Sequence, residues 1–284
     1  MVTIFDGKTF AEKKIARLDK EVAKLKNGGI HPKLASIIVG EDPASLLYVS
    51  LKKKKAESIG AEMDIYFLKE KDFLETILAL IDSLNSDPTV YGIMVQLPLP
   101  SIFSRQDREM VINSIRESKD VDGLRENSLF LHPTSKAVID VIDESKNTID
   151  YNSTCADMSS SERCHGTNPI VCVVGATGMV GRPLVKELKK EGYQVIECDH
   201  DTKDLEQKTI KADILISVTG KPALITKDMV KVGATVIDVG SPKGDISLGV
   251  YEVAGFITPV PGGIGPITIA SLLENLVKAS KITT

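Results

Sequence analysis

PIVCVVGATGMVG, residues 169–181, decides the fold more clearly than any other stretch of this sequence. The apolar run 170–174 has the composition of a buried strand, and three glycines, Gly175, Gly178 and Gly181, follow it before an amphipathic segment that predicts a helix. A glycine-rich turn between strand and helix lets a pyrophosphate lie on the helix N-terminus, where free N–H groups favour an anion. The spacing is GxxGxxG rather than the commoner GxGxxG, so a turn used only for close helix–strand packing is the alternative. A second strand at 194–198 favours dinucleotide binding.

Asp199 stands directly after that second strand, where the adenosine ribose of a dinucleotide is expected. A carboxylate there accepts hydrogen bonds from a ribose 2′-OH and repels the 2′-phosphate of NADP. The alternative is a solvated loop acid in the run Asp199-His200-Asp201. The residues we assign to the cofactor site are Gly175, Ala176, Thr177, Gly178, Met179, Val180, Gly181, Asp199 and Thr219.

Length and composition exclude several classes of protein. The 284 residues correspond to roughly two domains at about 150 residues each. A 42% hydrophobic content excludes a disordered chain, and 35 basic against 39 acidic residues provide no general field for nucleic acid. Four cysteines make no disulfide framework, and no apolar run approaches the ~20 residues that span a membrane. Because the start, MVTIFDGK, lacks a signal-peptide pattern, we expect a cytoplasmic protein that binds neither nucleic acid nor membrane.

Helical and strand-like segments alternate along most of the chain. The first half predicts helices at 10–25, 44–59 and 74–84 and strands at 34–39, 63–68 and 92–96. The second half predicts strands at 170–174, 194–198, 214–218 and 234–239 and a helix at 179–190. This alternation is typical of βαβ units and largely parallel sheets. The polar stretch 147–168 interrupts it and is interpreted as a linker or surface loop.

Three segments of the first half have the composition of a chemical site. Tyr48 and Lys52 are four residues apart, so on a helix they share one face; a surface helix with a lysine run is the alternative. In VQLPLP, residues 95–100, Gln96 ends a strand, where α/β proteins place ligands. KDVDG, residues 119–123, brings two acids to a turn glycine, with an ordinary surface turn as the alternative.

Together these segments resemble the bifunctional methylenetetrahydrofolate dehydrogenase/methenyltetrahydrofolate cyclohydrolase family. The resemblance covers nearly the whole chain, from FDGK at 5–8 to the run TPVPGGIGPIT at 258–268. It implies oxidation of 5,10-methylenetetrahydrofolate by NAD(P)+ to the methenyl form, and then hydrolysis of that form to 10-formyltetrahydrofolate. It also implies a homodimer. The alternatives are a monofunctional NAD-dependent dehydrogenase and a non-catalytic folate- or nucleotide-binding regulator.

The resemblance also implies site residues. Lys52 matches the catalytic lysine, Gln96 the glutamine that orients it, and Tyr48 the tyrosine that packs on the folate. Asp122 matches the acid that binds the pterin's amino and ring N–H groups. The remaining substrate-binding residues are expected in a loop between the domains: Pro261, Gly262 and Gly263.

We therefore predict an α/β protein of two domains with the active site in the cleft between them. An N-terminal α/β catalytic domain occupies 1–145, and the last helix, 269–284, packs back on it. A Rossmann-type dinucleotide-binding domain occupies 146–268.

The chain departs from the family pattern at four places. Residues 132–137, HPTSKA, lack the cysteine and glycine of the family's PCTPxG. The linker is longer than usual, and the loop from Gly240 to Asp245 is shorter. Many NADP-using members have Arg-Ser after the first glycine of the turn and a serine after the next strand, where this chain has Ala176-Thr177 and Asp199. These last changes favour NAD, although Arg182 and Lys203 provide alternative partners for a phosphate.

We predict no metal site. Cys155 and Cys164 are nine residues apart and His165 follows them, a pattern without the close CxxC pair of structural zinc sites. We interpret these three as loop residues, and Cys172 and Cys198 as core residues of strands.

Overall fold

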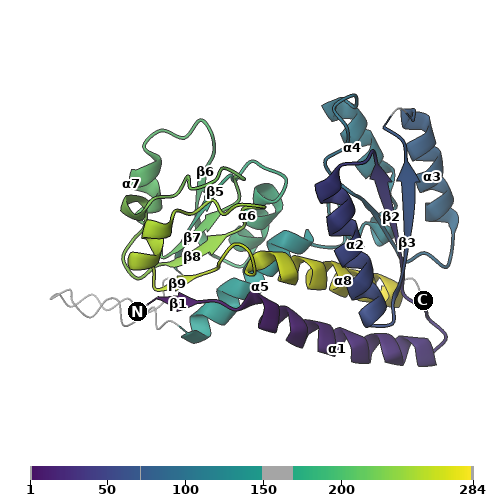
Figure 1. Ribbon diagram of the computed structural model, residues 1–284, viewed down its shortest axis with the longest axis horizontal. Coiled ribbons are helices and arrows are strands. Elements are labelled where there is room, and N and C mark those ends of the chain that lie inside the picture. Colours follow the sequence, from purple (N-terminus) through teal and green to yellow (C-terminus); the bar gives the residue numbers. More distant parts are fainter. Residues whose placement is uncertain (1, 71, 149–168, 283–284) are drawn as a thin grey trace. The chain divides into compact units, whose positions relative to one another are not determined.

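The computed structural model describes residues 2–70, 72–148 and 169–282, and the chain forms two compact units (Figure 1). The three-stranded unit comprises Ala11–Pro133 and Ile269–Thr284, and the six-stranded unit comprises Met1–Phe10 and Thr134–Thr268. The predicted linker lies outside the described residues from 149 onward, and so do Cys155, Cys164 and His165.

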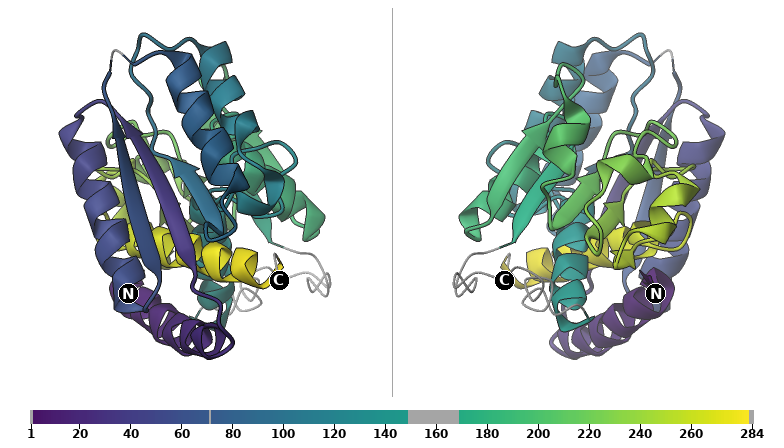
Figure 2. Two further views of the ribbon diagram at one scale, coloured as in Figure 1. Left: turned by 90° about the vertical axis from the view of Figure 1, so that its right-hand side faces the viewer. Right: turned by 90° about the vertical axis from the view of Figure 1, so that its left-hand side faces the viewer.

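A parallel sheet with helices on both faces forms the three-stranded unit, in the strand order β3–β2–β4 (Figure 2). Its strands are β2 (Lys33–Val39), β3 (Glu62–Leu68) and β4 (Gly92–Val95). Alternate residues of β2 face opposite sides. Leu34 and Ile38 pack against α1 (Gly7–Asn27), α2 (Pro43–Ser58) and α8 (Ile264–Ile282). Ala35, Ile37 and Val39 pack against α3 (Leu74–Ser86) and α4 (Arg105–Ser114). Because both faces are covered, β2 is a nearly continuous apolar run.

The six-stranded sheet is also parallel, in the order β1–β9–β8–β7–β5–β6. Its strands are β1 (Thr3–Ile4), β5 (Ile170–Val174), β6 (Gln194–Cys198), β7 (Ile214–Ser217), β8 (Thr235–Asp238) and β9 (Phe256–Ile257). The helix α6 (Gly181–Lys190) follows β5 and buries Leu184 and Leu188. From β5 onward the order is 2-1-3-4-5, so the winding direction reverses between β5 and β7. Open α/β sheets bind ligands at such a switch point.

The structure adds elements that the sequence pattern did not reveal. They are α4, α5 (Pro133–Thr148), α7 (Leu205–Thr209), β1, β9 and 3-10 turns at Glu117–Lys119, Lys227–Met229 and Leu248–Glu252. The helix α4 buries only Val111, so it has little apolar periodicity, but Ser104 and Asp107 form a capping box at its start. The predicted helix at 179–190 begins at Gly181 instead. None of the helices in the described ranges has the length and apolar character that crossing a membrane requires.

The division into units differs from the predicted domain boundaries at residues 1–10 and 134–145, which lie in the six-stranded unit. Backbone pairing explains the first difference, because Thr3 N donates to Gly255 O at 2.8 Å and Phe5 N to Ile257 O at 2.9 Å. A two-residue strand is too short for a sequence pattern to reveal. The second follows from contacts of α5, where the Ser135 hydroxyl donates to Val180 O at 3.0 Å.

Candidate functional site

Lys52 lies on the buried face of α2. Asp42 caps this helix by accepting a hydrogen bond from Ser45 N at 2.8 Å, and Pro43 occupies its first turn. The buried positions of the helix are Ser45, Val49, Lys52 and Ala56. This helical spacing puts the lysine on the stripe that faces the sheet, and only 5% of its surface is exposed. The lysine run at 52–55 therefore contains one inward-facing amine.

Three side chains surround the amine of Lys52. Its Nζ donates to Gln96 Oε1 at 3.1 Å, lies 3.8 Å from Met94 Sδ and is 5.0 Å from the centroid of the Tyr48 ring. Burial lowers the pKa of Lys52, and the negative charge of Asp122 partly opposes this shift. An amine with a lowered pKa exchanges protons more readily near neutral pH than an exposed lysine does.

Gln96 is held rigidly at the carboxyl end of β4. Its backbone N donates to Ile37 O at 2.8 Å, which continues the ladder with β2. Its side-chain Nε2 donates to Leu97 O at 2.7 Å. With the amide nitrogen engaged there, Oε1 is the atom that faces the Lys52 amine.

Asp122 belongs to a loop that the structure fixes from two sides. Asn275 of α8 donates through Nδ2 to Val121 O and to Leu131 O, both at 2.9 Å. One amide thus links the segment that ends in Asp122 to the segment that ends in His132. A Cβ at Gly123 would lie 2.6 Å from His132 N, which only glycine permits. The two segments therefore touch.

Charges in this cluster act on one another. Burial raises the pKa of Tyr48, and the charge of Asp122 raises it further, so the phenol stays neutral. Burial lowers the pKa of His132, with Asp122 opposing and Lys52 assisting. Burial also raises the pKa of Asp120 to about 6, although Arg125 N and Leu124 N donate to its carboxylate. The structure thus brings Lys52, Gln96, Tyr48 and Asp122 into one neighbourhood.

The sequence does not assign His132 or Asn275 to this neighbourhood, and it indicates Asp120 only as one of the two acids of KDVDG. His132 is 8% exposed, and in the sequence it is distinguished only by lying where the chain departs from the family motif. Its departure from PCTPxG was the available signal. Asn275 gave none, because an asparagine within an apolar helix indicates burial only once the fold is known.

The glycine turn joins β5 to α6 through its backbone. Gly175 N and Ala176 N donate to Cys198 O at 2.8 and 3.0 Å, which ties the turn to the end of β6. A Cβ at Gly181 would lie 2.1 Å from Gly175 O, so the helix can begin this close to the strand only with glycine there. Thr177, Gly178 and Met179 are exposed. An open backbone beside the N-terminus of α6 fits a pyrophosphate.

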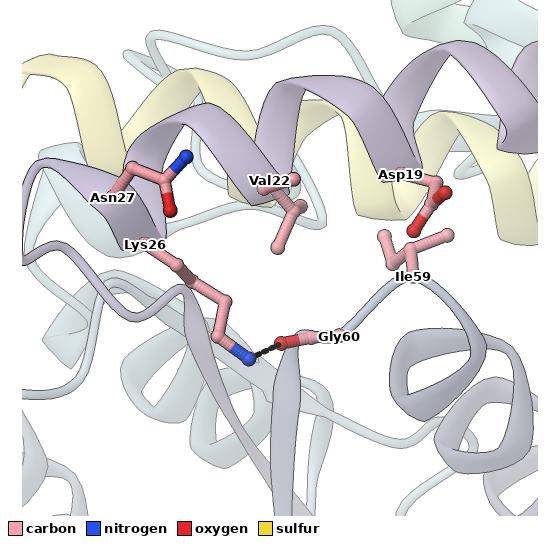
Figure 3. Close-up of a pocket in the computed structure, with 7 residues that line it drawn as sticks. Asp19, Val22, Lys26, Asn27, Ile59 and Gly60 are labelled. Atoms are coloured by element: carbon pink, nitrogen blue, oxygen red, sulfur yellow. Dashed lines mark hydrogen bonds between the residues drawn. The ribbon is translucent and has the colours of Figure 1, made fainter.

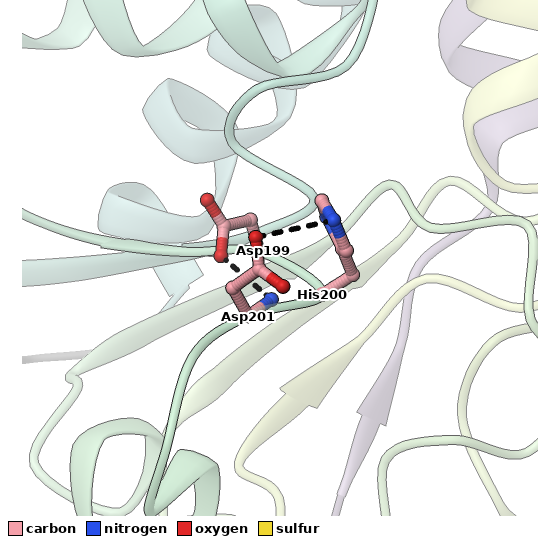
Figure 4. A group of neighbouring side chains, drawn as sticks. All are labelled: Asp199, His200 and Asp201. Carbon is pink, nitrogen blue, oxygen red and sulfur yellow. Dashed lines mark hydrogen bonds and ion pairs between the residues drawn. The ribbon is translucent and has the colours of Figure 1, made fainter.

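Asp199 directly follows β6, whose last residue accepts hydrogen bonds from the glycine turn. Figure 4 shows Asp199 with its neighbours His200 and Asp201. Its Oδ1 accepts hydrogen bonds from Asp201 N at 3.0 Å and Thr202 Oγ1 at 3.2 Å. His200 Nε2 lies 3.2 Å from Asp201 Oδ2. Ligand atoms of Asp199, His200 and Asp201 come within 4.8 Å of one another, but a tight turn brings consecutive residues together without any ion, so we assign no metal to them.

The predicted loop residues Pro261, Gly262 and Gly263 belong to the six-stranded unit. Gly263 N donates to Pro259 O at 2.8 Å, and a Cβ at Gly7 would lie 1.9 Å from Gly263 O. A Cβ at Gly263 would itself lie 2.6 Å from Pro259 O, so Gly263 has a packing role. Contact of Pro261, Gly262 and Gly263 with substrate stays a prediction.

A pocket of about 290 Å³ lies elsewhere in the three-stranded unit (Figure 3). Val22, Lys26, Ile59 and Gly60 are among the residues that line it, and Lys26 Nζ donates to Gly60 O at 3.3 Å. It contains none of the predicted site residues, and we assign no function to it.

Comparison with known proteins gives full-length matches. The family model described as "Tetrahydrofolate dehydrogenase/cyclohydrolase, catalytic domain" matches residues 5–122, and "Tetrahydrofolate dehydrogenase/cyclohydrolase, NAD(P)-binding domain" matches residues 152–284. The bifunctional protein FolD of Exiguobacterium sibiricum is 40% identical over 99% of this chain and 100% of its own length.

Solved structures agree with these matches. The bifunctional FolD methylenetetrahydrofolate dehydrogenase/cyclohydrolase from Campylobacter jejuni has a TM-score of 0.89 and 35% identity, covering 100% of both chains. The corresponding enzyme of Trypanosoma brucei, complexed with NADP and an inhibitor, has a TM-score of 0.86 and 28% identity, covering 99% of this chain and 98% of that one.

Proposed function

This chain belongs to the tetrahydrofolate dehydrogenase/cyclohydrolase family. We propose that the buried amine of Lys52 performs the proton transfers of the reactions that this chain catalyses. The chain is a bifunctional enzyme of one-carbon metabolism. It oxidises 5,10-methylenetetrahydrofolate to the methenyl form and hydrolyses that form to 10-formyltetrahydrofolate. Neither the monofunctional alternative nor the non-catalytic regulator is supported by these matches.

The single observation that supports the proposal is an inward-facing lysine with a lowered pKa, hydrogen-bonded to an oriented amide. In its neutral form, Lys52 can accept a proton from the water that attacks the methenyl carbon. The Gln96 carbonyl oxygen then accepts a hydrogen bond from the resulting ammonium. Because Gln96 is fixed by Leu97 O, the amine keeps its direction in both protonation states.

Asp122 and Tyr48 are proposed to bind the folate. A carboxylate accepts hydrogen bonds from the amino and ring N–H groups of a pterin, which are donors. Tyr48 presents a neutral aromatic face beside the Lys52 amine. A flat heterocycle can stack on that face with its reacting carbon near the amine. Pro261, Gly262 and Gly263 remain in the proposed substrate site on the strength of the family resemblance.

We place the dinucleotide on the glycine turn, residues 175–181, with Asp199 at the adenosine ribose. The exposed residues 177–179 and the start of α6 fit a pyrophosphate. NAD(P)+ held there would supply the acceptor for the hydride that leaves the methylene carbon. We propose NAD as the preferred coenzyme, because Ala176 supplies no guanidinium and Asp199 would repel a 2′-phosphate. We also propose a homodimer, which the family resemblance implies.

Replacement of Lys52 by methionine tests the proposal. We expect Lys52→Met to lower the rate of methenyl hydrolysis, corrected for the uncatalysed reaction, by about a hundredfold or more, as loss of a general acid–base typically does. The affinity for NADH should stay within twofold. Lys53→Met is the matched control, because Lys53 is the next residue on the same helix and is 41% exposed. Wild-type hydrolysis in Lys52→Met would remove Lys52 from the mechanism.

A further inference from the structure

Asp245 is a fully buried acid in the six-stranded unit that has no role in the assignments above. It follows the short loop after β8, one of the places where the chain departs from the family pattern. Burial of a carboxylate is costly unless donors surround it. Its surroundings therefore indicate what the residue does.

One oxygen of Asp245 accepts four hydrogen bonds. The hydroxyls of Ser217 and Thr219 and the backbone N of Thr219 donate to Oδ2, each at 2.8 Å, and Gly220 N donates at 3.2 Å. Three of these four donors belong to the turn 218–221, which follows β7. The other oxygen, Oδ1, is buried without a hydrogen-bond partner among the described residues. The carboxylate thus holds the turn through a single atom.

The backbone of Asp245 is itself fixed on both sides. Asp245 N donates to Asp238 Oδ1 at 3.0 Å, and Asp245 O accepts a hydrogen bond from Ile225 N at 3.0 Å. Gly240 N also donates to Asp238 Oδ1, at 2.8 Å. The short loop therefore connects the end of β8 to the turn after β7 through two successive carboxylates.

The turn 218–221 lies directly beside the glycine turn. Val218 N donates to Val174 O at 2.9 Å, and a Cβ at Gly175 would lie 2.9 Å from Val218 O. These two turns follow β7 and β5, the neighbouring strands at the switch point of the sheet. Any ligand bound in that crevice has the 218–221 turn as one wall.

The bonds to Asp245 also limit what Thr219 can offer to a ligand. Its hydroxyl donates to Asp245 and accepts from Lys221 N at 3.2 Å, and its backbone N–H is engaged as well. Gly220 N is engaged in the same way. The turn therefore contributes its shape and its remaining carbonyls, and that shape depends on Asp245.

We propose that Asp245 is a positioning residue for the dinucleotide: its carboxylate fixes the 218–221 turn against the glycine turn, so that the crevice between β5 and β7 is formed before the cofactor binds. Preformed sites bind more tightly because binding does not have to order them. Loss of the carboxylate should therefore weaken cofactor binding and leave hydrolysis in the three-stranded unit unaffected. This inference rests on the proposed placement of the cofactor on the glycine turn.

The experiment measures the NADH dissociation constant and both activities of Asp245→Ala. Because the chain contains no tryptophan, NADH fluorescence reports binding with little protein background. We expect the dissociation constant and the KM for NAD to rise at least tenfold, with kcat at saturating NAD within threefold and methenyl hydrolysis within twofold. The NADH dissociation constant of Asp245→Asn should stay within threefold of wild type, since the amide oxygen of asparagine can accept hydrogen bonds from the same donors.

Asp213→Ala is the matched control. Asp213 also accepts a backbone hydrogen bond in this unit, from Ile170 N at 2.8 Å, but at the opposite end of β5. The affinity of the Asp213→Ala variant for NADH should stay within twofold of wild type. An equal loss in Asp213→Ala, or no loss in Asp245→Ala, would overturn the proposal. If Asp245→Ala fails to fold, Ser217→Ala removes one donor from the same oxygen, and an unchanged dissociation constant would then overturn it.

Thr177→Asp separates this inference from the proposed function. Thr177 is exposed on the glycine turn, so an added carboxylate there would repel a pyrophosphate without disturbing packing. If Thr177→Asp binds NADH as wild type does, the cofactor is not on the glycine turn and the proposed placement fails. If Thr177→Asp weakens binding and Asp245→Ala does not, only the role of Asp245 fails.

Discussion

The neighbourhood of Lys52 and the glycine turn differ in the groups that they offer to a ligand: buried side chains in the first, exposed residues in the second. Around Lys52, the side chains are buried and their charges act on one another, so that the pKa values of Lys52, Tyr48 and His132 all move from their usual values. At the glycine turn, the exposed residues 177–179 lie close to a helix N-terminus. Proton transfer depends on a tuned side chain, whereas binding of an anion depends on an open backbone.

This contrast predicts that the two regions respond independently to substitution. Changes around Lys52 should alter folate binding and hydrolysis, and changes at the glycine turn should alter the dinucleotide. Methenyl hydrolysis measures the effect of changes around Lys52, and coenzyme binding measures the effect of changes at the glycine turn.

The largest effect after Lys52→Met is expected for Asp122→Ala. The pterin then loses an anionic acceptor, and charge-assisted hydrogen bonds of this kind contribute roughly 1.5–3 kcal/mol. The folate KM should rise about tenfold to a hundredfold, measured in the dehydrogenase assay at saturating coenzyme. NADH affinity should stay within twofold.

Glu126→Ala is the control for this substitution, because Glu126 is an exposed acid in the same loop. It should leave the folate KM unchanged. A wild-type folate KM in Asp122→Ala would remove Asp122 from the site. The neighbourhood of Lys52 would then not bind folate through this carboxylate.

The coenzyme preference tests the roles of Ala176 and Asp199 in the six-stranded unit. We expect wild type to have a kcat/KM for NAD at least tenfold above that for NADP, a difference of about 1.4 kcal/mol. The double substitution Ala176→Arg with Asp199→Ser should shift the ratio at least tenfold towards NADP, because it adds a guanidinium and removes a carboxylate. Both coenzymes are compared at one ionic strength.

Methenyl hydrolysis in the double variant serves as its control and should stay within twofold of wild type. A tenfold preference of wild type for NADP would mean that another cation, such as Arg182 or Lys203, holds the 2′-phosphate. In that case Asp199 does not set the specificity.

The smallest effect is a change of stability with pH in Lys52→Met. Because burial lowers the pKa of Lys52, the unfolded chain binds a proton that the folded chain lacks between that lowered pKa and the usual value of about 10.4. The cost of burying the amine is therefore fully present below the lowered pKa and disappears as the pH rises to about 10.4. Lys52→Met should have a Tm a few degrees above wild type at neutral pH, and this gain should shrink towards pH 10.

Thermal unfolding from pH 7 to pH 10 measures this difference, with Lys53→Met expected to show none. A gain that stays constant with pH would mean that the methionine stabilises by packing alone. The amine would then not be the group whose charge the fold disfavours.

Several elements could be predicted because they carry a strong local pattern. The strand β5 is a continuous apolar run and β2 a nearly continuous one, and the glycine turn follows β5 at a spacing that a sequence displays directly. The helix α4 gives no helical periodicity because its three apolar residues, 110–112, are consecutive, and β1 gives no pattern because it consists of two residues that pair only with the distant β9. Non-local pairing leaves no periodicity in the sequence.

The sequence by itself determined the α/β class, the parallel sheets and the glycine turn, and its motifs indicated the family, because periodicity and turn chemistry act between near neighbours. Only the tertiary structure decided that Lys52, and not its neighbours in the lysine run, faces inward against Gln96, since burial depends on which face of α2 meets the sheet. It likewise decided that Asn275 joins two loops more than 140 residues away, and that Asp245 accepts hydrogen bonds from four donors, one at the end of β7 and three in the turn that follows it. Hydrogen bonds between residues this far apart in the chain exist only after the fold has brought them together.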